Sequence, residues 1–299
     1  MAEIKRAIAL GFFDGVHLGH AALLNKTKER AAQIGAIPSV LSFDTHPDTL
    51  VFKKEVPLIN SAMGRQDIIR REFGIENVVF IHFNQRVMQM PWQEFAQEII
   101  EELSVGWIVV GHDFTFGNKG EGTAQKLSEY CAQRNIGCDI ISPVRNQGIV
   151  VSSTYIRQLI ENGEIAKANE FLGHPHMLAD TVRSGYHLGT RLGAPTINMY
   201  FPDGVLVPRR GVYATRVVLE DGSSHMAVTN VGVRPTVSET NKVSVESHIL
   251  DFSGKLYDRQ VRVEFYEFIR DEKKFSGTQE LKEQIQKDAQ ATKDFFSRK

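Results

Sequence analysis

The chain has 299 residues, enough for one large or two ordinary domains. Its 35 basic and 36 acidic residues give a formal net charge of −1, so no overall field attracts nucleic acid or an anionic membrane. A hydrophobic content of 42% and a charged content of 24% are typical of a soluble globular protein and argue against a disordered or fibrous one.

The sequence shows no charged leader followed by an apolar segment and no run of eighteen apolar residues. We therefore expect a cytoplasmic protein with no membrane partner. Cys131 and Cys138 do not form a metal-binding motif at their spacing. We expect them to be reduced thiols, as is usual for cysteines inside the cell.

The first half of the chain alternates apolar strand signals with helical patterns. We predict strands at 7–10, 39–43, 78–83, 107–110 and 138–141. Between them we predict helices at 21–34, 62–73, 92–103 and 124–134. This alternation is typical of βαβ units and predicts an α/β domain with a parallel sheet. Gly35, Gly74 and Gly137 each follow a helical pattern, where the residue after a helix end is expected.

The second half is different. Two more helices are predicted at 153–161 and 164–172, and the pattern then changes after Gly173. Strand signals follow at 213–219, 225–231, 244–250 and 261–269. Short strands at this spacing predict a small antiparallel barrel, against which a mixed-charge helix at 278–296 would pack. We place the domain boundary between residues 177 and 178.

The segment 8–20, Ile-Ala-Leu-Gly-Phe-Phe-Asp-Gly-Val-His-Leu-Gly-His, is the most informative about function. His17 and His20 lie three residues apart where a helix would begin, so both rings can face one ligand beside backbone N–H groups that favour an anion. A metal site is the alternative and needs further ligands, of which His46 is the nearest candidate. The glycines of the segment favour phosphate, because they allow close backbone approach. We predict a nucleoside triphosphate site at the carboxyl end of the first strand.

This segment resembles the HxGH signature of the adenylyltransferase and cytidylyltransferase superfamily, and its longer form GFFDGVHLGH resembles bacterial FAD synthetases. Three further stretches are similar to motifs of the same family: SSTYIR at 152–157, GHDFTFG at 111–117 and SFDTHP at 42–47. The resemblance implies a Rossmann-like nucleotidyltransferase domain. It also implies that the phosphate of FMN attacks the α-phosphorus of ATP, with Mg²⁺ bridging the phosphates, to give FAD and pyrophosphate.

The resemblance also implies roles for individual residues. His17 and His20 would stabilise the transition state at the α-phosphorus, and Arg157 would hold the leaving pyrophosphate. No general base is expected here, since a phosphate monoester is already a nucleophile at neutral pH. The implied ATP-binding residues are Gly11, Phe12, Phe13, Asp14, Gly19, Asp113, Ser152, Ser153 and Thr154. The implied flavin-binding residues are His46, Phe114, Phe116 and, from the second half, Arg270.

Ordinary structural roles compete with several of these assignments. Hydroxyl residues at the start of a helix, as at 152–154, commonly cap it. Aromatic residues beside a turn, such as Phe114 and Phe116, commonly pack in a core. His46 either touches a phosphate or caps its own turn. The residues alone leave these alternatives open.

The second half carries its own constellation. Thr196 and Asn198 lie two residues apart, so on an extended segment both face one side and can ligate a hard cation such as Mg²⁺. Together with the glycine-spaced loop before them, they resemble the GxxLGxPTxN signature of riboflavin kinases, with Thr190 and Ala194 as departures. The resemblance implies a phosphate loop with glycines at three positions: Gly185, Gly189 and Gly193.

Glu246 is an ordinary solvent-facing strand residue by pattern alone. The resemblance makes it the base that accepts the proton of the ribityl 5′-hydroxyl as that oxygen attacks the γ-phosphorus of ATP. An alcohol, unlike a phosphate, benefits from general-base help. The chemistry therefore requires a carboxylate in this half and not in the other.

The favoured hypothesis is a bifunctional riboflavin kinase and FMN adenylyltransferase acting on riboflavin, FMN and ATP, with no nucleic acid partner. The adenylyltransferase would occupy residues 1–177 and the kinase residues 178–299. One alternative is a monofunctional FAD synthetase whose barrel is inactive or weak. Another is a flavin-binding regulator without turnover, although no basic helix-turn-helix is present to bind DNA. A nucleotidyltransferase for another substrate would leave the second half unexplained.

Overall fold

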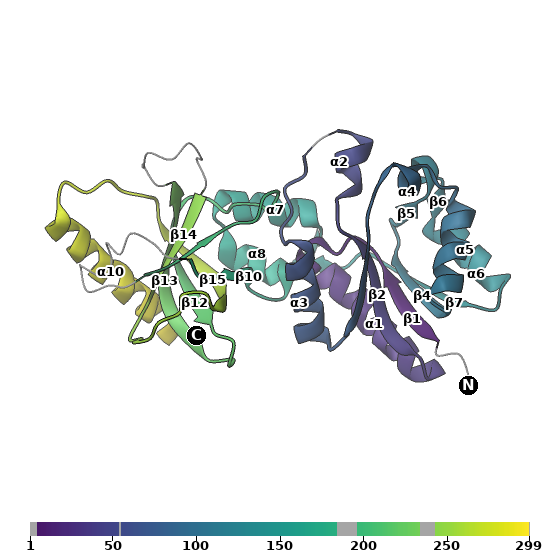
Figure 1. Cartoon of the computed structure of the whole chain (residues 1–299), viewed down its shortest axis with the longest axis horizontal. Coiled ribbons are helices and arrows are strands. Elements are labelled where there is room, and N and C mark those ends of the chain that lie inside the picture. The colour runs from purple at the N-terminus through teal and green to yellow at the C-terminus, as the bar shows by residue number, and fades with distance from the viewer. Residues whose placement is uncertain (1–4, 54, 184–195, 234–242, 299) are drawn as a thin grey trace. The chain divides into compact units, whose positions relative to one another are not determined.

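The computed structural model describes residues 5–53, 55–183, 196–233 and 243–298. The chain divides into two compact units, Met1–Ser153 and Thr154–Lys299 (Figure 1). Two helices that precede residue 177 therefore belong to the second unit. The boundary between residues 177 and 178 stays a prediction of where the two activities divide.

The first unit is built on a parallel sheet of five strands in the order β3-β2-β1-β4-β7. Its strands are β1 (Arg6–Leu10), β2 (Ile37–Phe43), β3 (Asn77–Ile81), β4 (Val105–Gly111) and β7 (Gly137–Ile141). Its longer helices are α1 (Leu18–Ile34), α3 (Ala62–Phe73), α5 (Trp92–Glu102) and α6 (Ala124–Ala132). The predicted α/β class is confirmed. The strand order reverses at β1, so the carboxyl ends of β1 and β4 mark the place where such sheets bind ligands.

Short elements fill the connections of this unit. They are η1 (Asp14–Val16), α2 (Pro47–Val51), α4 (Gln85–Gln89), β5 (Thr115–Phe116), η2 (Asn118–Gly120), β6 (Gly122–Thr123), β8 (Arg145–Asn146) and β9 (Ile149–Val150). The core follows from the alternation of side chains along the strands. Ile8 and Leu10 of β1 join Ile108 and Val110 of β4 in one buried cluster, which residues of α5 and α6 complete.

Two of the three glycines predicted after helices have that role. Gly35 and Gly74 end α1 and α3 in the left-handed conformation, with φ of 62° and 65°. The prediction for Gly137 is wrong, because α6 ends at Ala132 and Gly137 begins β7. A Cβ at Gly137 would lie 2.2 Å from the ring of Trp107 on the neighbouring strand. Close approach of that ring, not a helix end, requires the glycine.

The second unit opens with α7 (Ser153–Asn162) and α8 (Ile165–Leu172) and continues as an antiparallel sheet in the order β10-β15-β12-β13-β14-β11. Its strands are β10 (His176–Thr181), β11 (Thr196–Tyr200), β12 (Gly211–Val218), β13 (Ser224–Val233), β14 (Val243–Ile249) and β15 (Gln260–Arg270). The helix α10 (Thr278–Ser297) contacts β12, β13 and β15.

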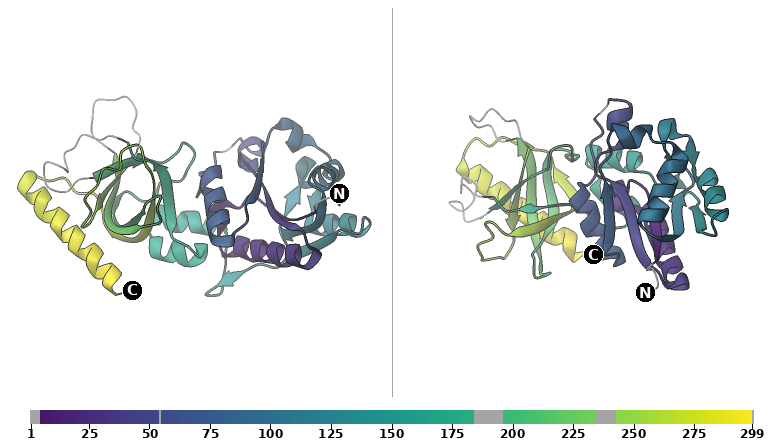
Figure 2. Two further views of the ribbon diagram at one scale, coloured as in Figure 1. Left: turned by 60° about the horizontal axis from the view of Figure 1, so that its bottom comes forward. Right: turned by 45° about the vertical axis from the view of Figure 1, so that its right-hand side comes forward.

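The edges of this sheet meet. The backbone N–H of Arg183, just beyond β10, donates to the carbonyl of Asn198 in β11 over 2.9 Å. This bridge joins the first and last strands of the order, so the sheet curls into the predicted barrel, seen most clearly in the left view of Figure 2. None of the described helices is both long enough and apolar enough to cross a membrane.

Candidate active sites

The loop after β1 places both histidines at the start of α1. Phe13 has a left-handed backbone with φ of 59°, and Gly15 follows with φ of 78°. This tight turn brings the chain round so that His17 becomes the N-cap of α1. Its Nδ1 accepts a hydrogen bond from the backbone N–H of His20 over 3.3 Å. When Nδ1 accepts this bond, Nε2 is the ring nitrogen that can donate to a ligand.

The two imidazoles lie face to face. The ring centroids of His17 and His20 are 3.6 Å apart at an interplanar angle of 10°, and His20 also packs against the ring of Phe13. Burial lowers the pKa of His20 well below its usual value, and the neighbouring His17 and Arg65 add to the effect. His20 is therefore neutral at pH 7. The structure brings the predicted pair together at the start of α1.

Gly19 makes this stacking possible. A Cβ at Gly19 would lie 3.0 Å from Cε1 and 3.1 Å from Nδ1 of His17. The glycine between the histidines thus has a steric reason that the sequence did not show. Among the described residues, no group of three or more His, Cys, Asp or Glu side chains is placed to hold a metal ion. The metal interpretation of the histidine pair therefore lacks its further ligands.

Asp14 holds the loop after β1 in place through hydrogen bonds. It is 2% exposed, and its Oδ1 accepts from the backbone N–H groups of Ile59 and Asn60 over 2.9 and 3.3 Å. The hydroxyl of Ser153 donates to the carbonyl of Asp14 over 2.9 Å. Asp14 thereby ties the loop of β1 to the chain that leads into α3. Its contact with ATP stays a prediction, as do those of Gly11, Phe12 and Phe13.

His46 caps its own turn at the end of β2. Its Nδ1 accepts from the backbone N–H of Asp48 over 3.2 Å, and its ring meets the edge of Phe12 at 4.6 Å between centroids. The capping alternative is therefore realised. The imidazole nevertheless lies beside Phe12 in the loop that carries the histidine pair, and its contact with flavin stays a prediction.

The loop after β4 carries two aromatic residues that differ in exposure. Phe116 is 7% exposed and packs against Trp92 and Phe95, so it belongs to the core. Phe114 stacks on Phe116 at 5.3 Å and is only half-buried. Asp113 is exposed. Of the two predicted flavin-binding aromatics, Phe114 is the one that remains open to a ligand.

The hydroxyl-rich stretch opens α7 as predicted. Ser153 is the first residue of the helix, Thr154 is exposed, and Arg157 is half-buried one turn further on. Thr154 and Arg157 belong to the second compact unit, whereas Ser152 and Ser153 belong to the first. The roles of these residues stay predictions.

The barrel aligns its predicted residues by strand register. Asn198 of β11 lies directly opposite Glu246 of β14, and Thr196 lies opposite His248. On the other side of β14, Glu246 faces Asn230 of β13. Thr196 and Asn198 share one face of their strand, as predicted from their spacing. The predicted cation ligands and the predicted base thus lie on neighbouring strands.

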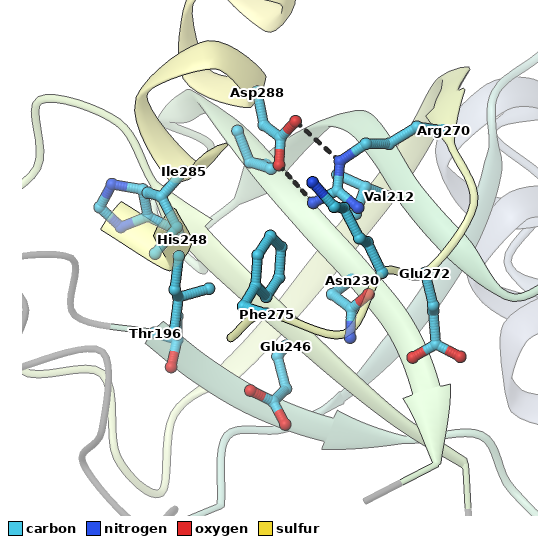
Figure 3. Close-up of a pocket in the computed structure, with 13 residues that line it drawn as sticks. Thr196, Val212, Asn230, Glu246, His248, Arg270, Glu272, Phe275, Ile285 and Asp288 are labelled. Atoms are coloured by element: carbon cyan, nitrogen blue, oxygen red, sulfur yellow. Dashed lines mark hydrogen bonds and ion pairs between the residues drawn. The ribbon is translucent and has the colours of Figure 1, made fainter. Parts of the chain in front are cut away.

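A pocket of about 250 Å³ is lined by Thr196, Asn230, Glu246 and His248, whereas Asn198 is 4% exposed and is not among its lining residues. Figure 3 shows that the side-chain oxygens of Thr196, Glu246 and Glu272 face the lower side of the view, while Asp288 lies across the pocket. The apolar part of the lining comes from both sheet and helix: Val212, Val228, Phe275, Leu281 and Ile285. The pocket therefore has an oxygen-rich end and an apolar side.

Arg270 belongs to this pocket but is tied to a carboxylate. Its Nε and Nη2 donate to the two oxygens of Asp288 over 2.9 and 2.7 Å. Asp288 is 4% exposed, and its Oδ1 also accepts from Gln284 over 2.8 Å. The pair fastens α10 to β15 at the wall of the pocket. Flavin binding by Arg270 stays a prediction.

Most lining residues were not singled out by the sequence analysis, and two polar ones are instructive. His248 lies two residues beyond Glu246, and this period alone places both on the same strand face. Glu272 follows the last strand and had no signal. Several predicted positions lie outside the described residues: Gly185, Gly189, Thr190, Gly193 and Ala194.

The parallel sheet with its histidine pair and the closed barrel with its oxygen-lined pocket define a two-domain protein of the nucleotidyltransferase and kinase class. Family models agree in chain order: FAD synthetase matches residues 1–155 and riboflavin kinase matches residues 172–296. The bifunctional riboflavin kinase/FMN adenylyltransferase of Listeria monocytogenes is 33% identical over 298 residues, covering 99% of this chain and 94% of its own. The chain belongs to the family of bifunctional riboflavin kinase/FMN adenylyltransferases, and the resemblance drawn from the motifs is confirmed.

Two further comparisons span both halves. The bifunctional riboflavin kinase/FMN adenylyltransferase of Pseudomonas fluorescens is 35% identical over 285 residues, covering 95% of this chain and 91% of its own. The crystal structure of a macrolide-efflux protein from Streptococcus pneumoniae has a TM-score of 0.84 at 27% identity, covering 98% of this chain and 95% of that one. The likeness to this structure extends over the whole fold.

Proposed function

We propose that this chain phosphorylates riboflavin to FMN with ATP and then transfers the adenylyl group of a second ATP to FMN, giving FAD and pyrophosphate. The observation that carries the proposal is the presence of two separate sites in one chain. A carboxylate faces the pocket of the barrel, and a stacked histidine pair lies at the carboxyl edge of the parallel sheet. The curated relatives share both halves at about one third identity.

The kinase reaction needs a base, and the position of Glu246 at the pocket supports this role. We assign its carboxylate to accept the proton of the ribityl 5′-hydroxyl while that oxygen forms a bond to the γ-phosphorus of ATP. The bond from that phosphorus to the bridging oxygen breaks, and ADP leaves. The apolar side of the pocket, which includes Val212 and Phe275, suits the flat flavin ring.

A divalent cation fits the oxygen donors of the barrel. The hydroxyl of Thr196 and the amide oxygen of Asn198 are hard ligands on one face of β11, directly across from β14. We propose that they hold Mg²⁺. When bound, the ion would neutralise charge on the phosphates of ATP.

The adenylyl transfer needs positioning more than proton transfer. An oxygen of the FMN phosphate forms the new bond to the α-phosphorus of ATP, and the bond to the pyrophosphate oxygen breaks. Nε2 of His17 can donate a hydrogen bond to a phosphoryl oxygen. His20 is stacked against His17, and we assign to it the same role of stabilising the transition state. Arg157 keeps the role of holding pyrophosphate that the motif implies.

The remaining assignments are part of the same proposal. We assign adenylyl transfer to residues 1–177 and the kinase to residues 178–299, and we place the enzyme in the cytoplasm. The alternative of a monofunctional FAD synthetase is not favoured, because curated relatives that carry both activities in their names match nearly the whole chain.

Flavin analysis by chromatography tests the proposal. Purified protein is incubated with ATP and Mg²⁺, once with riboflavin and once with FMN. We expect FMN and FAD from the first reaction and FAD with equimolar pyrophosphate from the second. If FMN gave FAD while riboflavin gave no product, the kinase half of the proposal would be wrong. If neither flavin reacted, both halves would be wrong.

A further inference from the structure

A fully buried arginine, Arg65, contacts the loop that carries the histidine pair. Arg65, in the first turn of α3, has no exposed surface. Its guanidinium donates from Nη1 to the carbonyl of Phe12 and to the hydroxyl of Ser42, and from Nη2 to the carbonyl of Phe43. The hydroxyl of Ser42 itself donates to the carbonyl of Phe12. One side chain therefore joins the loop after β1 to the end of β2.

The hydrogen-bond partners of Arg65 are all uncharged. Within the described part of the chain, no carboxylate forms an ion pair or a hydrogen bond with it. The nearby carboxylates are engaged by other donors: Asp14 by backbone N–H groups, and Asp44 by His82 and Phe83. Burial lowers the pKa of Arg65 to about 10, although the charges of Asp14 and Asp44 act to raise it, so the group is still protonated at pH 7. A buried positive charge thus persists next to the site.

The positive charge of Arg65 can stabilise the anionic substrates, which a neutral histidine cannot do by charge. His20 is neutral at pH 7, whereas the triphosphate of ATP and the phosphate of FMN are strongly anionic. In addition, the carbonyls of Phe12 and Phe43 carry partial negative charge next to the guanidinium. Hydrogen bonds from the guanidinium offset both carbonyl dipoles. Electrostatic stabilisation of this kind is stronger when the donor is buried and already in place.

We propose that Arg65 is a positioning residue for adenylyl transfer, which holds the Phe12 loop against β2 and supplies the fixed positive charge under the phosphates of ATP. The proposal rests on the adenylyltransferase function proposed above. Arg65 has no exposed surface, so it would not touch the substrate itself. Its action is through the backbone of Phe12 and through its field.

Arg30 provides a matched control in the same unit. It lies in α1 and forms a bidentate pair with Asp139 over 2.7 and 3.0 Å, while its guanidinium stacks on Trp107. Its charge is therefore neutralised by a direct ion pair, whereas Arg65 forms none among the described residues and is acted on by Asp14 and Asp44 only through space. Arg30→Met removes structural contacts together with a charge that a direct ion pair neutralises.

The experiment compares Arg65→Met, Arg65→Lys and Arg30→Met in the full-length enzyme. For each variant, KM for ATP and kcat are measured in the FMN-to-FAD reaction, and the melting temperature is recorded. We expect Arg65→Met to raise KM for ATP about tenfold or more. Arg65→Lys keeps the charge but loses the planar fork, so it should lower kcat while KM stays within about threefold. Arg30→Met should lower the melting temperature alone.

The pH profile gives a second readout that a merely structural role would not move. The groups whose charge acts on His20 are His17 and Arg65. Arg65→Met should therefore shift the acid limb of kcat/KM to higher pH, and Arg65→Lys should not. If Arg65→Met does not fold, Arg65→Lys decides, and an increase of KM by tenfold would overturn the proposal.

Other outcomes also discriminate. Wild-type KM and pH profile in Arg65→Met would overturn the role of Arg65, as would an equal rise of KM in Arg30→Met. Failure of the wild-type protein to convert FMN to FAD would instead refute the proposed function itself. The two failures are thus separable in one set of assays.

Discussion

The second unit should lose stability in mild acid because of one buried histidine. His176, the first residue of β10, is 1% exposed, and its ring lies 5.6 Å from that of Phe265, its partner across the strands. Neither ring nitrogen has a hydrogen-bond partner among the described residues. Burial, with a further contribution from His174, lowers the pKa of His176 from 6.5 to about 3.

The sign and size of the effect follow from proton linkage. The folded pKa is depressed, so the unfolded unit binds the proton more readily and the stabilisation is fully present only above about pH 6.5. It is lost as the pH falls toward 3. Between pH 8 and pH 5, the free energy of unfolding should fall by about 2 kcal/mol through His176 alone.

Oxidation of Met177 measures this change in the correct unit. Met177 follows His176 and is 5% exposed, so peroxide reaches it only after unfolding. Urea titrations at pH 8 and pH 5, with oxidation scored by peptide mass spectrometry, give the unfolding free energy at each pH. His176→Leu should reduce the pH dependence by about 2 kcal/mol, whatever its effect on stability at pH 8. His225→Leu, which removes a partly exposed histidine of β13, is the matched control.

A pH dependence that is the same in His176→Leu as in the wild type would refute this reasoning. It would mean that the acid sensitivity of the barrel comes from other groups. Loss of the dependence in His225→Leu as well would point to a general effect of removing a histidine.

Three further predictions concern single side chains. Gly19→Ala should displace the ring of His17 and slow FAD formation from FMN about tenfold or more, with phosphorylation of riboflavin as the internal control; equal rates would contradict the steric role of the glycine. Asp288→Asn should weaken the buried pair with Arg270, lower barrel stability by about 3 kcal/mol and raise KM for riboflavin; an unchanged urea midpoint would count against the pair. Asn198→Ala should raise the Mg²⁺ concentration needed for a half-maximal kinase rate, while the FMN-to-FAD reaction keeps its own requirement. Titration of both reactions with Mg²⁺ tests this, and an unchanged kinase requirement would contradict the role of Asn198.

Regular patterns in the sequence predicted most of the fold. The apolar run before Gly11 became β1 because its residues are buried on both faces, and the helix predicted at 62–73 agrees with α3. The strands β10 and β11 were not predicted as strands. β10 pairs with β15 and β11 pairs with β14, and these pairings join segments that are far apart in the sequence. The pairing that makes them strands is therefore visible only in the folded barrel.

The site residues also divide into those that the sequence predicted and those that only the structure shows. Spacing alone placed Thr196 and Asn198 on one strand face, and the histidine pair on one helix start. Gly137 is required by the ring of Trp107, and Arg65 acts on the backbone carbonyl of Phe12. Both contacts join segments that are distant in the sequence. Neither contact leaves a local signal. An arginine on a predicted helix is ordinarily exposed, so its burial had to be seen.

The central claim is that one chain holds two independent sites, and a mixing experiment tests it most directly. Glu246→Gln should convert FMN to FAD but make no FMN, and His20→Ala should make FMN but no FAD. Neither variant alone should form FAD from riboflavin. A mixture of the two, supplied with riboflavin, ATP and Mg²⁺, should form FAD, because FMN released by one variant is used by the other. If the mixture formed no FAD although each variant kept its own half-reaction, FMN would not pass between molecules, and if either variant lost both half-reactions, the assignment of separate sites would be contradicted.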